Sequence, residues 1–119
     1  MKNSKKIAVI TGGAGFIGSH MIDLLLSKKY KVNVIDNLSG GHKKNLTHHK
    51  KNSDLKFEKS DICKLKKTHK FFKNADFVFH FAGIGDIVPS IENPDNYMQT
   101  NIQGTVKVLE AARYNGIKK

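Results

Sequence analysis

The chain has 119 residues, of which 39% are hydrophobic and 26% are charged, which is ordinary for a single soluble domain with one core. Its net charge is +11, but Arg113 is the only arginine among the 21 basic residues. Because arginine suits phosphates and base edges better than lysine does, we interpret the charge mainly as solvated surface lysines. A DNA or nucleotide partner stays an open alternative.

Cysteine usage and hydropathy limit where the protein can act. Cys63 is the only cysteine, so an intrachain disulfide is excluded and we expect a cytoplasmic protein. We interpret Cys63 itself as an inert, partly buried small residue. No apolar run approaches the roughly 20 residues needed to span a bilayer, so no membrane partner is expected.

The predicted elements alternate between strands and helices. Strands are predicted at 6–11, 30–36, 55–62 and 76–83. Helices are predicted at 15–27, 64–74 and 93–116, with a polar loop and a short surface helix in 38–53. The strand runs are short and apolar, as buried parallel strands are. This order predicts an α/β fold with a doubly wound parallel sheet of four strands in the order 3-2-1-4 and right-handed crossovers.

The segment TGGAGFIGSH (11–20) carries the strongest functional signal. It follows a predicted strand and opens a predicted helix, which is the setting of a dinucleotide-binding loop. Gly12 can make the tight turn, Gly15 lets the backbone approach a pyrophosphate, and Gly18 lets the helix pack on the strand. Phosphates are favoured at the helix N-terminus by its N–H groups and dipole. We therefore predict a Rossmann-like dinucleotide-binding site.

Asp36 supports the same interpretation. It ends the second predicted strand, near the offset of about 20 residues at which an acid meets the adenosine ribose. A carboxylate there accepts hydrogen bonds from both ribose hydroxyls and repels a 2′-phosphate. Since no arginine lies nearby in the sequence, NAD is favoured over NADP as the cofactor.

Several segments resemble the extended short-chain dehydrogenase/reductase superfamily, in particular its NAD-dependent epimerase/dehydratase family. TGGAGFIGSH matches that family's TGxxGxxG, whereas Phe16 stands where the simpler reductases need a glycine. Further similar segments are DNLSGG (36–41), SDI (60–62), HFAG (80–83) and the NxxGT of residues 101–105. The chain is similar to the UDP-glucose 4-epimerase type, which also carries HFAG. Gly85 departs from the pattern, because some epimerases have a lysine there.

The resemblance implies, position by position, which residues bind NAD. The residues implied for the pyrophosphate are Gly12, Gly15, Phe16, Ile17 and Gly18. Those implied for the adenosine ribose are Asp36, Asn37, Leu38 and Ser39. Those implied to flank the adenine are Asp61 and Ile62, and those implied to line the path to the nicotinamide are Phe81, Ala82 and Gly83. Thr100 or Asn101 would approach the cofactor from the last predicted helix.

Three histidines are candidate metal ligands or bases. His80 ends a buried strand, and we interpret it as a packed, hydrogen-bonded side chain. His48 and His49 are adjacent in a polar loop without acidic partners in the sequence. We therefore predict no metal site.

The resemblance implies that the catalytic residues lie outside this chain. The family uses a Ser or Thr and a YxxxK pair, in which the tyrosine is the acid/base at the sugar hydroxyl and the lysine lowers its pKa. Tyr114 and Lys118 have this spacing, but Gly116 between them is predicted to end the helix. We therefore predict no catalytic residue here. Residues 1–119 are expected to be a partial NAD-binding Rossmann domain, truncated before the fifth strand.

The function expected from the resemblance belongs to a longer protein. That protein is expected to be a homodimeric nucleotide-sugar epimerase or dehydratase, an isomerase or lyase, and the 119 residues alone are expected to be inactive. One alternative is a non-catalytic dinucleotide-binding module that regulates a partner. A basic nucleic-acid-binding protein is the less favoured alternative.

Overall fold

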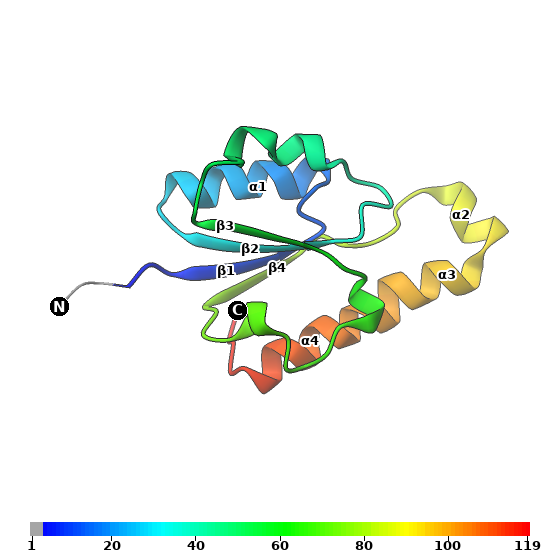
Figure 1. Cartoon of the computed structure of the whole chain (residues 1–119). Helices are drawn as coiled ribbons and strands as arrows, with labels where there is room; N and C mark the ends of the chain where they lie inside the picture. Colours follow the sequence, from blue (N-terminus) through cyan, green and yellow to red (C-terminus); the bar gives the residue numbers. More distant parts are fainter. Residues whose placement is uncertain (1–3) are drawn as a thin grey trace.

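The computed structural model describes residues 4–119, and its centre is one parallel sheet with strands in the order β3-β2-β1-β4 (Figure 1). The strands are β1 (Ile7–Thr11), β2 (Lys31–Asp36), β3 (Leu55–Lys59) and β4 (Phe77–His80). The predicted order is therefore confirmed. Two strands end earlier than predicted. After β3, the Asp61 carboxylate accepts the N–H of Cys63 and starts a turn, and after β4, Ala82 donates to the Thr11 side chain and leaves the ladder.

Alternate residues of the central strands supply two separate cores. Ala8 and Ile10 of β1 face one side, where they pack with α1 (Phe16–Ser27) and with Leu46 of the 3₁₀ helix η1 (Lys43–His49). Val9 faces the other side, where it packs with α4 (Gly104–Tyr114) and with Phe72. Figure 1 shows α1 and η1 over one face of the sheet and α4 over the other. Both faces are covered, as a parallel sheet requires.

The prediction of a helix at 64–74 is wrong. The structure has two short 3₁₀ turns there, η2 (Ile62–Lys64) and η3 (Lys70–Phe72). His69 caps η3, because its Nδ1 accepts the backbone N–H of Phe71 at 3.1 Å, and its Nε2 contacts Glu58 at 2.6 Å. Such side-chain bonds to the backbone compete with a regular helix. The connection is held by the burial of Leu65 and the two phenylalanines of η3 rather than by helical periodicity.

The long helix predicted at 93–116 exists but is interrupted. It comprises α3 (Pro94–Met98), a π-helical turn η4 (Gln99–Gln103) and α4, and it is preceded by a helix that was not predicted, α2 (Ile87–Glu92). Pro94 occupies the first turn of α3, and Gly116 adopts a φ of +70° beyond α4, as expected for a start and a stop. Short π-helical turns are frequent at functional sites.

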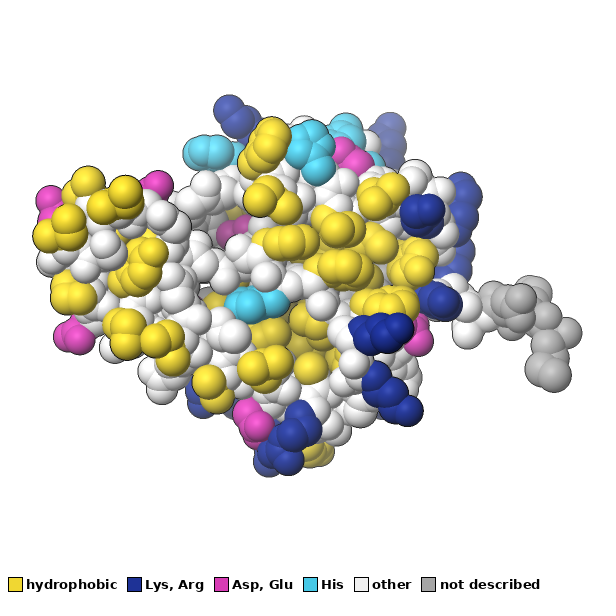
Figure 2. All heavy atoms as spheres, turned by 180° about the vertical axis from the view of Figure 1, so that it is seen from behind, with side chains coloured by type: hydrophobic (Ala, Val, Ile, Leu, Met, Phe, Trp, Pro, Cys, Tyr) yellow, Lys and Arg dark blue, Asp and Glu magenta, His cyan; other side chains and the backbone are white. Residues whose placement is uncertain are grey.

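Apolar side chains are unusually exposed on one face. Figure 2 shows them gathered over the protruding helices and beside the sheet. Those on α2, α3 and η4 include Ile87, Val88, Ile91, Met98 and Ile102. Within residues 4–119, no helix combines the length and apolar character that crossing a membrane would require.

Candidate functional site

The glycine loop between β1 and α1 is built by close backbone contacts. Gly12 has a φ of +71° and donates its N–H to the Ile35 carbonyl at 2.8 Å. A Cβ on Gly12 would lie 2.6 Å from the backbone nitrogen of Ala82, and a Cβ on Gly18 would lie 2.3 Å from the Gly12 carbonyl oxygen. These contacts agree with the predicted roles of Gly12 in the turn and of Gly18 in helix–strand packing.

Gly15 differs from these two glycines because it faces open space. It is the N-cap residue of α1, and a Cβ there would meet only the Gly12 carbonyl oxygen, at 3.4 Å. The first helical hydrogen bond joins the Ser19 N–H to the Gly15 carbonyl at 3.0 Å. The N–H groups of Phe16 and Ile17 therefore precede the helical ladder, where an anion can accept them.

Asp36 ties the glycine loop to the end of β2. Its side chain is buried, and its Oδ2 accepts the Ala14 N–H at 2.9 Å while its Oδ1 accepts the Leu38 N–H at 2.7 Å. A carboxylate has about four acceptor positions. These two bonds leave two of the positions unused, and Asp36 is among the residues that line a cleft beside the glycine loop. Asp36 thus has a structural role, while its role at the adenosine ribose stays a prediction.

A cleft of about 830 Å³ runs along the carboxyl ends of the strands. The predicted site residues that line it are Gly12, Gly15, Asp36, Asn37, Ser39, Asp61, Ile62, Phe81, Ala82, Gly83 and Thr100. Those that do not line it are Phe16, Ile17, Gly18, Leu38 and Asn101. The Leu38 side chain packs against the α1 core instead, with a φ of +63° that turns the chain after β2.

Asn101 acts on the cleft through the loop that follows β4. Its Oδ1 accepts the Ile84 N–H at 2.7 Å, and its Nδ2 donates to the Ile84 carbonyl at 2.8 Å. A Cβ on Gly83 would lie 3.1 Å from the same Oδ1. The π-helical turn therefore clamps the loop whose other side lines the cleft, while Thr100 of the same turn faces the cleft itself.

His80 is held between two hydroxyl groups. Thr105 donates to the Asn101 carbonyl at 2.6 Å, so its oxygen accepts the His80 Nε2–H at 2.9 Å. The Nδ1 of His80 then accepts the Thr11 hydroxyl at 2.6 Å. Burial lowers the pKa of His80, because it disfavours the charged form. The interpretation of His80 as a packed, hydrogen-bonded side chain agrees with this geometry.

Several lining residues were missed by sequence reasoning. They include Cys63 and Lys64 of η2 and Gly85 and Asp86 before α2. Burial, together with the neighbouring Asp61, raises the pKa of the Cys63 thiol, so it stays protonated and weakly nucleophilic. Its Sγ donates to the Gln99 carbonyl at 3.3 Å. No periodic signal marks these residues, because they lie in irregular connections.

Tyr114 and Lys118 do not form a helical pair. Tyr114 is the last residue of α4, and the positive φ of Gly116 turns the chain before Lys118. The cation over the Tyr114 ring is not Lys118 but Lys67, whose ammonium lies 5.4 Å from the ring centroid. Neither Tyr114 nor Lys118 lines the cleft.

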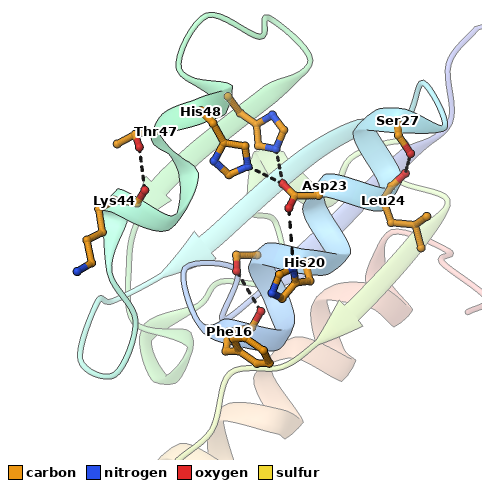
Figure 3. A network of polar contacts seen from close by, with 10 residues as sticks. Phe16, His20, Asp23, Leu24, Ser27, Lys44, Thr47 and His48 are labelled. Carbon is orange, nitrogen blue, oxygen red and sulfur yellow. Dashed lines mark hydrogen bonds and ion pairs between the residues drawn. The ribbon is translucent and has the colours of Figure 1, made fainter.

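The expectation that His48 and His49 lack an acidic partner is wrong. Asp23 of α1 contacts both of them. Its Oδ1 is 2.7 Å from the Nε2 of His48 and 2.5 Å from the Nε2 of His49 (Figure 3). The pairing was missed because these residues are more than twenty positions apart in sequence and meet only when η1 packs beside α1.

Comparison with known proteins decides the family. The model described as the NAD dependent epimerase/dehydratase family matches residues 8–119. The chain belongs to this family. A putative UDP-glucose 4-epimerase from Methanocaldococcus jannaschii is 38% identical over 112 residues, covering 93% of this chain and 35% of that protein.

Two solved structures show the same fold. A UDP-N-acetylglucosamine 4-epimerase from Methanobrevibacter ruminantium M1, in complex with UDP-N-acetylmuramic acid, has a TM-score of 0.87 and 38% identity, covering 98% of this chain and 36% of that one. A dTDP-glucose 4,6-dehydratase from Streptomyces venezuelae, with NAD and TYD bound, has a TM-score of 0.85 and 32% identity. The match covers 93% of this chain and 37% of that one. The chain spans roughly a third of the length of these relatives, and the cofactor of the family is NAD.

Proposed function

We propose that this chain supplies the NAD-binding part of a nucleotide-sugar epimerase or dehydratase. The observation that carries the proposal is the cleft where the glycine loop, Asp36 and the loop after β4 meet. In open α/β sheets, ligands bind at the carboxyl ends of the strands, where the strand order reverses. In this sheet the order reverses between β1 and β4, and the cleft is lined by the residues that follow both strands.

The residues in the cleft fit the cofactor. The volume of about 830 Å³ falls within the roughly 300–1,000 Å³ of small-molecule sites. The open side of Gly15 lets a pyrophosphate approach the N-terminus of α1, and the two remaining acceptor positions of Asp36 suit ribose hydroxyls. Asp61 and Ile62 line the cleft at the start of η2, and we place the adenine beside them.

The chemistry is divided between this chain and the rest of the enzyme. Bound NAD would supply reversible hydride transfer with a carbon of the sugar. The residues of this chain bind and orient the cofactor, and Asn101 fixes the loop that borders its path. Tyr114 and Lys118 lie outside the cleft, so we propose that the acid/base groups come from elsewhere in the longer protein. The 119 residues alone would then bind NAD without turnover.

Calorimetry with NAD and NADP on the wild type and on Asp36→Asn tests the proposal. The wild type is expected to bind NAD at least about tenfold more tightly than NADP, because juxtaposed like charges cost several kcal/mol. Asp36→Asn removes the negative charge, so the ratio between the two affinities should shrink. If Asp36 only holds Ala14 and Leu38 in place, Asp36→Asn would lower the affinities for NAD and for NADP by the same factor.

Two outcomes would contradict the proposal. Absence of saturable NAD binding by the folded wild type would remove the cleft as a cofactor site. Epimerisation of a nucleotide sugar by the purified 119 residues would refute the proposal that the acid/base groups come from elsewhere in the longer protein. His42→Ala is a suitable control, because His42 is exposed and does not line the cleft.

A further inference from the structure

The side chains of Asp23, His48 and His49 converge on one point of the surface, outside the cofactor cleft. One potential ligand atom from each lies within 4.8 Å of the others. Both imidazole Nε2 atoms contact the same carboxylate oxygen, Asp23 Oδ1, and the two rings lie 4.0 Å apart between centroids. Figure 3 shows His48 of η1 and Asp23 of α1 pointing toward one another. Figure 2 shows histidine side chains gathered beside an acidic one over these two elements.

We propose that Asp23, His48 and His49 bind a divalent transition-metal ion of the Zn²⁺ class. Two imidazoles and one carboxylate are a common three-ligand set for zinc, with a fourth position left to water. Bonds of about 2.0–2.2 Å place neighbouring ligand atoms of a tetrahedral site about 3.3 Å apart. The contacts of 2.7 and 2.5 Å need to open by less than about 1 Å, which small side-chain rotations supply.

The two elements that carry the ligands are fixed before any ion arrives. Asp23 follows the fully buried Ile22 of α1, and η1 is anchored by buried Leu46. Asn45 donates its Nδ2 to the Ala14 carbonyl at 2.8 Å, and the His49 carbonyl accepts the Asn52 N–H at 2.8 Å. Sites on rigid elements lose less entropy on binding. The cluster therefore resembles a prepared site more than a chance encounter of mobile side chains.

Exposure and charge define which ions can enter. The side chains of His48 and Asp23 are 55% and 42% exposed, whereas that of His49 is 17% exposed, so the open coordination position faces solvent. Exposed lysines lie within η1 and directly after it, among them Lys44 and Lys50, and their positive charge disfavours cations held by charge alone. Imidazole nitrogen selects zinc, copper and nickel over magnesium and calcium. We therefore expect Zn²⁺ to bind and Mg²⁺ not to bind.

Titration calorimetry of the folded 119-residue chain with Zn²⁺, in a buffer that does not chelate it, tests this site. The wild type should bind one ion per chain. His48→Ala, His49→Ala and Asp23→Asn should each weaken binding by at least the roughly 10- to 100-fold that loss of an outer-shell partner costs. The matched control is His42→Ala, which removes an exposed histidine from the start of η1 and should leave the affinity unchanged.

The results that overturn the proposal are equally specific. The proposal fails if His42→Ala and His48→Ala weaken Zn²⁺ binding equally, if Mg²⁺ binds as tightly as Zn²⁺, or if Zn²⁺ does not bind. The cluster would then be only a hydrogen-bonded link between α1 and η1. Circular dichroism establishes that each variant is folded. If a variant unfolds, the visible spectrum of Co²⁺ on the wild type decides, because tetrahedral coordination by protein ligands supports the site and an octahedral aqua-ion spectrum refutes it.

Discussion

Gly15 and Gly18 stand three residues apart in one motif, yet the structure predicts opposite consequences for their replacement by alanine. A Cβ on Gly18 would lie 2.3 Å from the Gly12 carbonyl oxygen and 2.8 Å from the Cα of Gly13, both of them backbone atoms. Ordinary contacts begin near 3.4 Å, so α1 must move about 1 Å away from the strand. Overpacking of this kind costs about 1–3 kcal/mol. At about 4 °C per kcal/mol, we expect Gly18→Ala to lower Tm by roughly 4–12 °C.

Gly15→Ala should leave stability nearly unchanged and weaken NAD binding. The backbone of Gly15 is extended, with a φ of −78° and a ψ of 178°, which alanine adopts easily. The gain from a less flexible unfolded chain, about 0.4–1 kcal/mol, opposes a similar loss from a poorer N-cap residue. The new methyl group would occupy the side from which a pyrophosphate approaches, and we expect at least tenfold weaker binding, or about 1.4 kcal/mol.

Thermal unfolding followed by circular dichroism, together with NAD calorimetry, separates the two roles. Gly40→Ala is the control for stability alone, since nothing lies within 4 Å of a Cβ at that position but Gly40 lines the cleft. His42→Ala, outside the cleft, is the control for NAD binding. The reasoning is refuted if Gly18→Ala melts with the wild type. It is equally refuted if Gly15→Ala is destabilised as much as Gly18→Ala while binding NAD normally.

Two further predictions concern the contacts beneath the cleft. Because burial lowers the pKa of His80 in the folded chain, the unfolded chain takes up a proton more readily as the pH falls through the ordinary value of 6.5. The free energy of unfolding should therefore decrease from about pH 7.5 to pH 5.5, and urea titrations should show a weaker decrease for His80→Gln. The same dependence of the unfolding free energy on pH in the wild type and in His80→Gln would contradict this. Asn101→Ala should lose two hydrogen bonds to Ile84, each worth about 0.5–1.5 kcal/mol, and bind NAD more weakly in calorimetry, whereas Asn101→Asp, which keeps the acceptor, should be intermediate. Equal stability and equal NAD affinity of the two variants would show that the hydrogen bonds of Asn101 to Ile84 do not cause the loss of binding.

The sequence predicts those parts of the fold that have a regular pattern of apolar residues or a backbone position that only glycine can occupy. The strand order follows from four short apolar runs with crossovers, and Gly12 and Gly18 are marked by contacts that only glycine permits. The segment 64–74 was misassigned because the side chain of His69 caps a 3₁₀ turn, a local bond that periodicity does not record.

The candidate site was predicted in part for the same reason. Asp36 is marked by its position at the end of a strand, although its bonds to Ala14 and Leu38 were not foreseen. Asn101 was placed near the cofactor, but it clamps Ile84 rather than lining the cleft. Asp23 and the two histidines of η1 could not be joined from the sequence, because their contact depends on how two distant elements pack.

The central claim is that the cleft at the carboxyl ends of the strands binds NAD, and an NMR titration of the ¹⁵N-labelled chain with NAD tests it most directly. We predict saturable shifts in the amides of residues 12–18, 36–39 and 81–83, with no comparable shifts in residues 48–53 at the end of η1 and after it. Shifts that do not saturate, or that follow the exposed lysines rather than these three loops, would contradict the account.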